Sequence, residues 1–167
     1  MPSLYQRETR AVTLASLQPA LSEPLAAWAR RQGLALDAVT VWCTHSVNPP
    51  GQALVARLLG RRANTVDPDA SHDTALVLLA THLIVATYGA RRGASVLGLA
   101  LRDATVTRGR ATVGAFGAAE PDDDGISITG FAGDEAGRPA SYFFGLGGAE
   151  ADACFAAVAR AVRESQA

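Results

Sequence analysis

The chain has 167 residues, enough for one domain or for a compact domain with an extension, but hardly for two large domains. With 49% hydrophobic and 19% charged residues, it is not a wholly disordered chain, and a globular fold with a real core is expected. The formal net charge of -1 provides no overall basic field, so nucleic acid is not an expected partner.

The first part of the chain predicts a mixture of helix and strand. Large apolar residues recur at helical spacing over 17–32, which predicts a helix with one apolar face. The β-branched, alternating stretch 38–44 predicts a strand, which the Asn-Pro-Pro-Gly sequence at 48–51 must end. Apolar residues over 54–59 predict a second, short helix. We therefore expect residues 1–71 to form a helix-strand-helix extension, an α/β unit.

From about residue 72 the pattern changes to short β-type runs that are separated by turn residues. These seven predicted strands are 75–80, 82–88, 95–101, 104–108, 111–116, 125–131 and 140–146. The connections are too short for βαβ crossovers, which indicates antiparallel hairpins. An amphipathic helix is predicted over 149–164. The expected fold class is α+β, with a seven-stranded antiparallel barrel or sandwich over 72–167 that this C-terminal helix caps.

A single core is expected inside the predicted barrel. Leu97, Leu99 and Leu101 recur at period two and should face one side of their strand. Phe155 and Val158 belong to the apolar stripe of the C-terminal helix. We expect these five residues to be buried together.

Seven antiparallel strands followed by one capping helix is an order that resembles the bacterial pleckstrin-homology-like (PH-like) domain family. The stretch 75–89, which contains Thr81, looks like the opening hairpin of bacterial members. The sequence Leu-Gly-Leu-Ala-Leu-Arg-Asp-Ala at 97–104 is similar to the short strand that follows in them. The resemblance covers about residues 72–165 and implies a binding or scaffolding role. A bacterial source is also expected, because all 15 basic residues are arginine.

The predicted compartment follows from the cysteines and from the apolar runs. Cys43 and Cys154 are the two cysteines, and they lie far apart in the sequence. Residues 1–8 lack the charged-then-apolar order of a secretory peptide. The longest apolar run, 75–88, is too short for a membrane helix. We expect a cytoplasmic protein with free thiols and no transmembrane segment.

Cys43 and His45 place a thiol and an imidazole two residues apart on the first predicted strand. Residues i and i+2 share a face of a strand, so the pair could act as nucleophile and base, with Asp37 or Asp73 orienting the imidazole. A zinc site would need more ligands at a recognisable spacing, which the chain does not show. The alternative is a buried thiol beside a polar strand end. We expect no metal and no cofactor.

Arg91 and Arg92 lie in a predicted hairpin turn, in the sequence Gly-Ala-Arg-Arg-Gly at 89–93. Arginine can hold an anion through two hydrogen bonds, and glycine allows the backbone to come close. These residues are therefore the candidate ligand-binding site for a small anion, and an exposed hydrophilic turn is the alternative. The acidic run at 120–125 is expected to be a solvated hairpin loop rather than a calcium site.

Two classes of function remain open. The first is a non-catalytic binding or interaction module, whose partner is an unknown protein or a small anionic ligand. The alternative is a small enzyme that uses Cys43 and His45. The extension at 1–71 is expected either to pack on the barrel or to make a homodimer.

Overall fold

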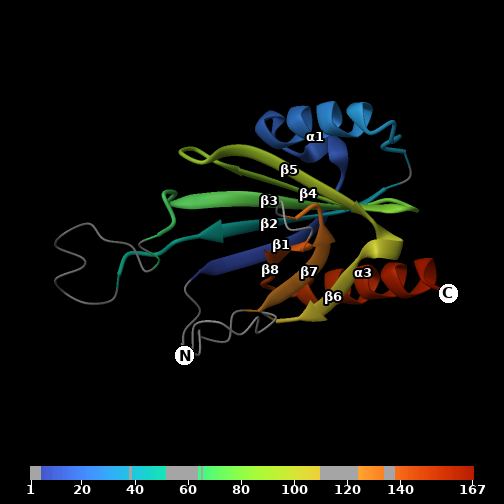
Figure 1. Cartoon of the computed structure of the whole chain (residues 1–167). Helices are drawn as coiled ribbons and strands as arrows, with labels where there is room; N and C mark the ends of the chain where they lie inside the picture. Colours follow the sequence, from blue (N-terminus) through green and yellow to red (C-terminus); the bar gives the residue numbers. More distant parts are fainter. Residues whose placement is uncertain (1–4, 38, 52–63, 65, 110–123, 134–137) are drawn as a thin grey trace.

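The computed structural model describes residues 5–37, 39–51, 64, 66–109, 124–133 and 138–167 (Figure 1). In chain order the elements are β1 (Gln6–Val12), η1 (Leu14–Ser16), α1 (Pro19–Arg31), β2 (Thr40–Val47), β3 (Ser71–Leu78), β4 (His82–Gly89), β5 (Gly93–Ala100), η2 (Leu101–Asp103), β6 (Thr105–Arg108), β7 (Gly125–Phe131), β8 (Ala140–Gly145) and α3 (Ala151–Ser165). Across these ranges, no helix is both long and apolar enough to cross a membrane.

The strands form two antiparallel sheets, so the fold is α+β. One sheet has five strands in the order β1-β2-β3-β4-β5, and the other has three in the order β6-β7-β8. Helix α1 covers one face of the larger sheet, here called the outer face, whereas the smaller sheet and α3 lie on its inner face (Figure 1). Within the described ranges the two sheets do not pair with each other to close a barrel.

Strands β3 and β4 are buried on both faces. Side chains alternate along a strand, so Leu76 and Val85 face the inner core while Val77 and Ile84 face α1. Each of these four side chains is at most 1% exposed. Double burial explains why this part of the chain is a nearly continuous apolar run instead of an alternating one.

Helix α1 is held against the outer face by one apolar stripe and by one close approach to the sheet. Leu21 and Leu25 are buried in the outer core, as the helical spacing of the sequence predicts. The ring of Trp28 lies directly over Gly98 of β5, where a Cβ atom would overlap the indole. Glycine is therefore required at this position for α1 to reach the sheet.

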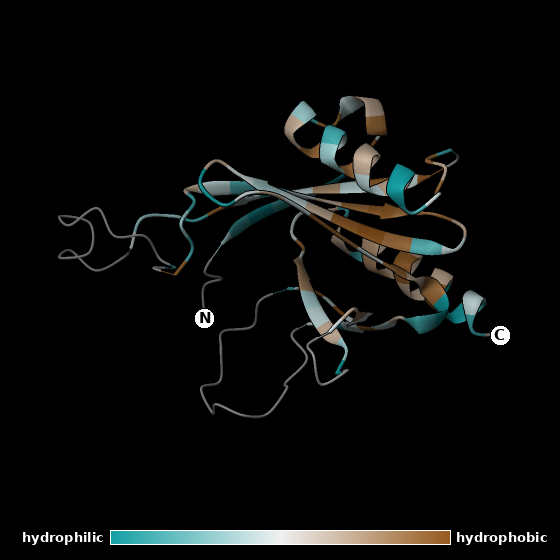
Figure 2. Cartoon of the chain, turned by 45° about the horizontal axis from the view of Figure 1, so that its top comes forward, coloured by the Kyte–Doolittle hydropathy of each residue, from teal (hydrophilic) through white to brown (hydrophobic). Residues whose placement is uncertain are grey.

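A row of hydroxyl groups crosses the inner face of the five-stranded sheet. Thr9, Thr44, Thr74, Thr87 and Ser95 are successive cross-strand partners from β1 to β5. The four threonines are at most 5% exposed, and the Oγ1 atoms of the first two lie 2.8 Å apart. The row separates the apolar part of the inner face from a polar end, and the strands likewise change from hydrophobic to hydrophilic along their length (Figure 2).

The structure matches much of the predicted order of elements. The predicted helices at 17–32 and 149–164 correspond to α1 and α3, and six of the seven strands predicted after residue 72 correspond to β3–β8. The helix predicted at 54–59 and the strand predicted at 111–116 lie outside the described residues. Strand β1 was not predicted. It pairs with β2, which pairs with β3, so the predicted boundary at residue 71 lies inside one continuous sheet.

The expected burial of Leu97 is wrong. Leu99, Leu101 and Val158 are buried in the inner core and Phe155 packs against them, but Leu97 is 41% exposed. Leu97 and Leu99 share the inner face of β5, as period two requires. Strand β7 covers Leu99, which lies close to Gly130. Leu97 precedes Leu99 by two residues on β5 and lies beyond this cover.

Replacing Leu25 should test how firmly α1 is bound to the sheet. Leu25 is 0% exposed, so Leu25→Ala is expected to lower the free energy of unfolding by about 2–5 kcal/mol. The matched control is Glu23→Ala on the exposed side of the same helix, which should change it by no more than about 0.5 kcal/mol. Chemical denaturation of the two variants measures the difference, and equal losses would show that α1 is not anchored through this side chain.

Candidate functional site

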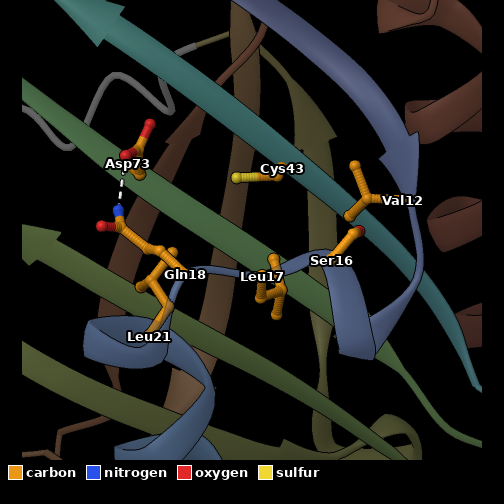
Figure 3. Close-up of a pocket in the computed structure, with 7 residues that line it drawn as sticks. All are labelled: Val12, Ser16, Leu17, Gln18, Leu21, Cys43 and Asp73. Carbon is orange, nitrogen blue, oxygen red and sulfur yellow. Dashed lines mark hydrogen bonds between the residues drawn. The ribbon is translucent and has the colours of Figure 1, made fainter.

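A small pocket lies on the outer face, at the start of α1. Its volume is about 230 Å³, and it opens between η1, the first turn of α1 and strands β1 to β3 (Figure 3). The lining residues are Val12, Ser16, Leu17, Gln18, Leu21, Cys43 and Asp73. Three aliphatic side chains thus share one pocket with a carboxylate, an amide, a hydroxyl and a thiol.

Strand alternation brings the pocket's polar groups to the outer face. Cys43 and His45 are two residues apart on β2 and therefore point to the same side. In the register of β2 with β3, Cys43 lies opposite Ala75 and His45 lies opposite Asp73. The small side chain of Ala75 leaves room beside the thiol, while Asp73 is brought next to the imidazole.

Asp73 connects the two sides of the pocket rim. Its Oδ2 atom accepts a hydrogen bond of 2.6 Å from Nε2 of Gln18, just before α1 (Figure 3). Its Oδ1 atom lies 2.6 Å from Nδ1 of His45, which donates to the carboxylate. Of the two acids considered as partners of the imidazole, Asp73 is the one that contacts it. Asp37 is exposed in the segment after α1.

The environment of the Cys43 thiol favours its protonated form. It is partly buried, and burial, with the nearby Asp73 carboxylate as the second cause, raises its pKa to about 11. The thiol lines the pocket together with Asp73, whereas His45 is not among the lining residues and its side chain is 54% exposed. The pocket therefore holds a protonated thiol beside a carboxylate.

The turn at Arg91 and Arg92 is held by acidic residues from the chain segment before β3. Asp69 accepts hydrogen bonds from the backbone amide of Arg91, at 2.7 Å, and from Nε of Arg92, at 2.8 Å. Asp67 forms a second ion pair with Arg92. The carboxylates of Asp67 and Asp69 are at most 3% exposed. The charge of Arg92 is thus already matched, and the predicted anion site would depend on the exposed Arg91.

A polar cluster extends from this turn to the start of β1. The hydroxyl of Tyr5 donates to Oδ2 of Asp67 at 2.5 Å and accepts from Nδ2 of Asn64 at 2.8 Å. His72 packs edge-on against the Tyr5 ring, and the Arg7 guanidinium lies 4.7 Å from the ring centre. We call Tyr5, Asp67, Asp69, His72 and Arg92 the polar cluster. It fills the polar end of the inner face.

The environment of the polar cluster shifts the pKa values of its members. Burial, followed by the hydrogen bond to Asp67, raises the pKa of Tyr5 to about 12. Burial is also the main cause that lowers the pKa of His72, and the Arg92 charge acts in the same direction. Burial raises the pKa of Asp67, but hydrogen bonds from Tyr5, Asp69 and Arg92 outweigh it, so the net pKa is lowered.

Among the residues that the structure describes, the other sequence candidates do not come together as a site. Over the ranges that the structure describes, no three or more His, Cys, Asp and Glu side chains gather as a metal site would require. Most of the acidic run at 120–125 lies outside those ranges, but Asp124 pairs with Arg108, which also contacts Asp152 at 3.0 Å. Cys154 is buried in the inner core with a pKa raised to about 12 by burial.

Sequence reasoning missed Gln18 and Tyr5 as functional positions. Gln18 was included in the predicted helix, whereas it precedes α1 and turns its amide toward Asp73. Tyr5 lies just before a strand that had not been predicted. The sequence of β1 does not alternate between apolar and polar residues, because Thr9 is its one buried side chain, so the pattern gives no signal for this strand.

Comparisons with known proteins identify no relative. No protein-family model matches the chain, and no match was found among curated proteins or among solved structures.

The delayed ionisation of Tyr5 gives a test of the polar cluster. The folded protein holds this proton to higher pH than the unfolded chain, whose pKa is 10.0, so the stabilisation is complete below that pH and is lost as the pH rises toward about 12. An absorbance titration of the three tyrosines should show one late step that Tyr5→Phe removes and Tyr88→Phe leaves in place. A late step that survives Tyr5→Phe would contradict the assignment.

Proposed function

We propose that the protein is a non-catalytic binding module whose outer-face pocket takes one small amphipathic group. This group is apolar over most of its length and has a cationic or hydrogen-bond-donating end. The observation that carries the proposal is the Asp73 carboxylate in the wall of a pocket with aliphatic walls. A ligand of this chemistry is either a free small amine or one side chain of a larger partner.

Charge at the pocket supports a cationic end group. Asp73 has one hydrogen-bond partner on each oxygen, and an ionised carboxylate can accept about four hydrogen bonds. On β1, Arg10 and Glu8 form an ion pair of 2.7 Å with each other. The negative charge of Asp73, 27% exposed, is therefore available to a donor that enters the pocket.

The size of the pocket limits what it can hold. Its volume of about 230 Å³ is below the range of roughly 300–1,000 Å³ that is typical of sites for drug-sized ligands. Val12, Leu17 and Leu21 would contact the apolar part of a short chain, and Cys43 would add a neutral wall. A branched alkyl amine of a few carbons fits this description.

The alternative, a small enzyme that uses Cys43 and His45, rests on the contact of His45 with Asp73. An acid that orients an imidazole is part of many catalytic arrangements. The thiol opposes this alternative, because a pKa of about 11 leaves roughly one thiolate in ten thousand at about pH 7. A nucleophilic cysteine needs the opposite shift, so binding is the better supported function.

We also propose that the chain is a PH-like domain of the cytoplasm. The antiparallel order of β3 to β8 followed by α3 supports the first part, with β1 and β2 as an addition to the first sheet. The free thiols of Cys43 and Cys154 support a reducing compartment.

Binding of isobutylamine tests the pocket. At neutral pH this amine is a cation, and it should shift the NMR amide signals of Gln18, Cys43 and Asp73, whereas the uncharged isobutanol should have a much weaker effect. Asp73→Asn keeps the size of the side chain but removes its charge, so the response to the amine should fall by about tenfold or more. An equal response of the wild type and the variant would refute a cationic site at Asp73.

The rate of alkylation tests the state of the thiol. Iodoacetamide should react with Cys43 slowly at neutral pH, and the rate should rise about tenfold for each pH unit, because only the thiolate reacts. Cys43→Ser provides the background rate from the buried Cys154. A rate that is already at its plateau near neutral pH would show a thiolate and would favour the enzyme.

A further inference from the structure

Strand β5 forms an unprotected edge of the five-stranded sheet. Strand β5 pairs with β4 on one side, and no strand among the described residues pairs with its other side. Its sequence, Gly-Ala-Ser-Val-Leu-Gly-Leu-Ala over Gly93–Ala100, contains no charged residue and no proline. Charges and prolines are the usual means by which proteins prevent an edge strand from pairing with another chain.

The opposite edge of the same sheet is protected by charged side chains and by contacts of its backbone. Strand β1 carries the charged residues Arg7, Glu8 and Arg10. Its backbone amides are also used, since Thr9 donates to the carbonyl of Gly147 at 2.8 Å and Ala11 donates to the Glu150 carboxylate. The sheet therefore has one protected edge and one open edge, and the charged residues of β1, which β5 lacks, account for part of this difference.

An exposed apolar side chain lies on the open edge. Leu97 is 41% exposed, and the other exposed large hydrophobic residue among those described is Val66, at 89%, outside the sheet. Leu97 lies opposite Val85 in the register of β4 with β5, so it continues the apolar row of the inner face to the edge. A second strand beside β5 would cover it.

We infer that β5 pairs antiparallel with β5 of a second copy of this chain, so that the two five-stranded sheets join into one across a two-fold axis. A strand paired with its own copy in this way must place one residue opposite itself. When Leu97 is that residue, the two exposed leucines meet on the inner face and Val96 of each chain lies opposite Gly98 of the other. No charge on β5 repels an identical strand.

Helix α1 also fits this arrangement. It contacts both β4 and β5 and therefore lies near the edge of the outer face. With strands about 4.8 Å apart, two such helices related by the axis would be spaced by roughly 10 Å, the usual distance for packed helices.

The absence of charge on β5 gives no means of selecting a different, charged partner, which favours the second copy. The pocket at Asp73 lies over β2 and β3, so this inference does not depend on the proposed function.

The mass of the full chain in solution tests the inference. Light scattering behind size exclusion should give twice the mass of one chain at micromolar concentrations. Leu97→Lys should give the monomer, because the pairing places two like charges opposite each other. The matched control, Val66→Lys, introduces the same charge at the other exposed apolar residue and should leave the dimer intact.

Mixing two variants makes the test specific for the two-fold register. Leu97→Lys and Leu97→Glu should each be monomeric alone and should form a dimer when they are mixed, because opposite charges then face each other across the axis. A wild-type monomer throughout the concentration range would overturn the inference, and would mean that β5 is covered by another part of the chain or by a different protein. A dimer that Leu97→Lys and Val66→Lys leave equally intact would also overturn it.

Discussion

The double burial of β3 and β4 is the constraint on which the rest of the structure depends. Neighbouring residues such as Leu76 and Val77 face different cores, so the same strands must be covered by α1 on one side and by the smaller sheet with α3 on the other. Neither layer replaces the other, because each buries the alternate half of the apolar side chains. The pocket forms at the boundary of the outer layer, where α1 begins and the cover of the sheet ends.

Polar groups are treated differently on the two faces of this sheet. On the inner face, the buried carboxylates of Asp67 and Asp69 both pair with the guanidinium of Arg92, and buried charges are tolerated when they are paired. On the outer face, Asp73 contacts the neutral amide of Gln18 and the imidazole of His45, and it stays partly open to solvent. This contrast separates a cluster that holds the fold together from a site that can still accept a ligand.

Local patterns in the sequence predicted most elements, but contacts between distant residues remained hidden. Alternation and turn residues were sufficient for the strands β3 to β8, and helical spacing was sufficient for α1 and α3. Strand β1 is not predicted from its sequence, because it contains the charged residues Arg7, Glu8 and Arg10 and buries one side chain, that of Thr9. The side of the strand that Cys43 and His45 share follows from their spacing, whereas the contacts of Asp73 with Gln18 and of Arg92 with Asp67 depend on how distant segments meet. The exposure of Leu97 depends on where β7 ends, which period two does not encode.

The hydroxyl row on the inner face has a consequence for how the chain folds. A strand that slips by two residues keeps its apolar side chains on the correct face, so hydrophobic burial alone barely opposes this error. In this sheet such a slip would move a threonine hydroxyl among apolar neighbours and leave Thr44 without the Thr9 oxygen or Thr87 without the Tyr142 hydroxyl, which now lie 2.8 Å away. The row thus raises the free energy of sheets with misaligned strands, which a purely aliphatic surface would tolerate.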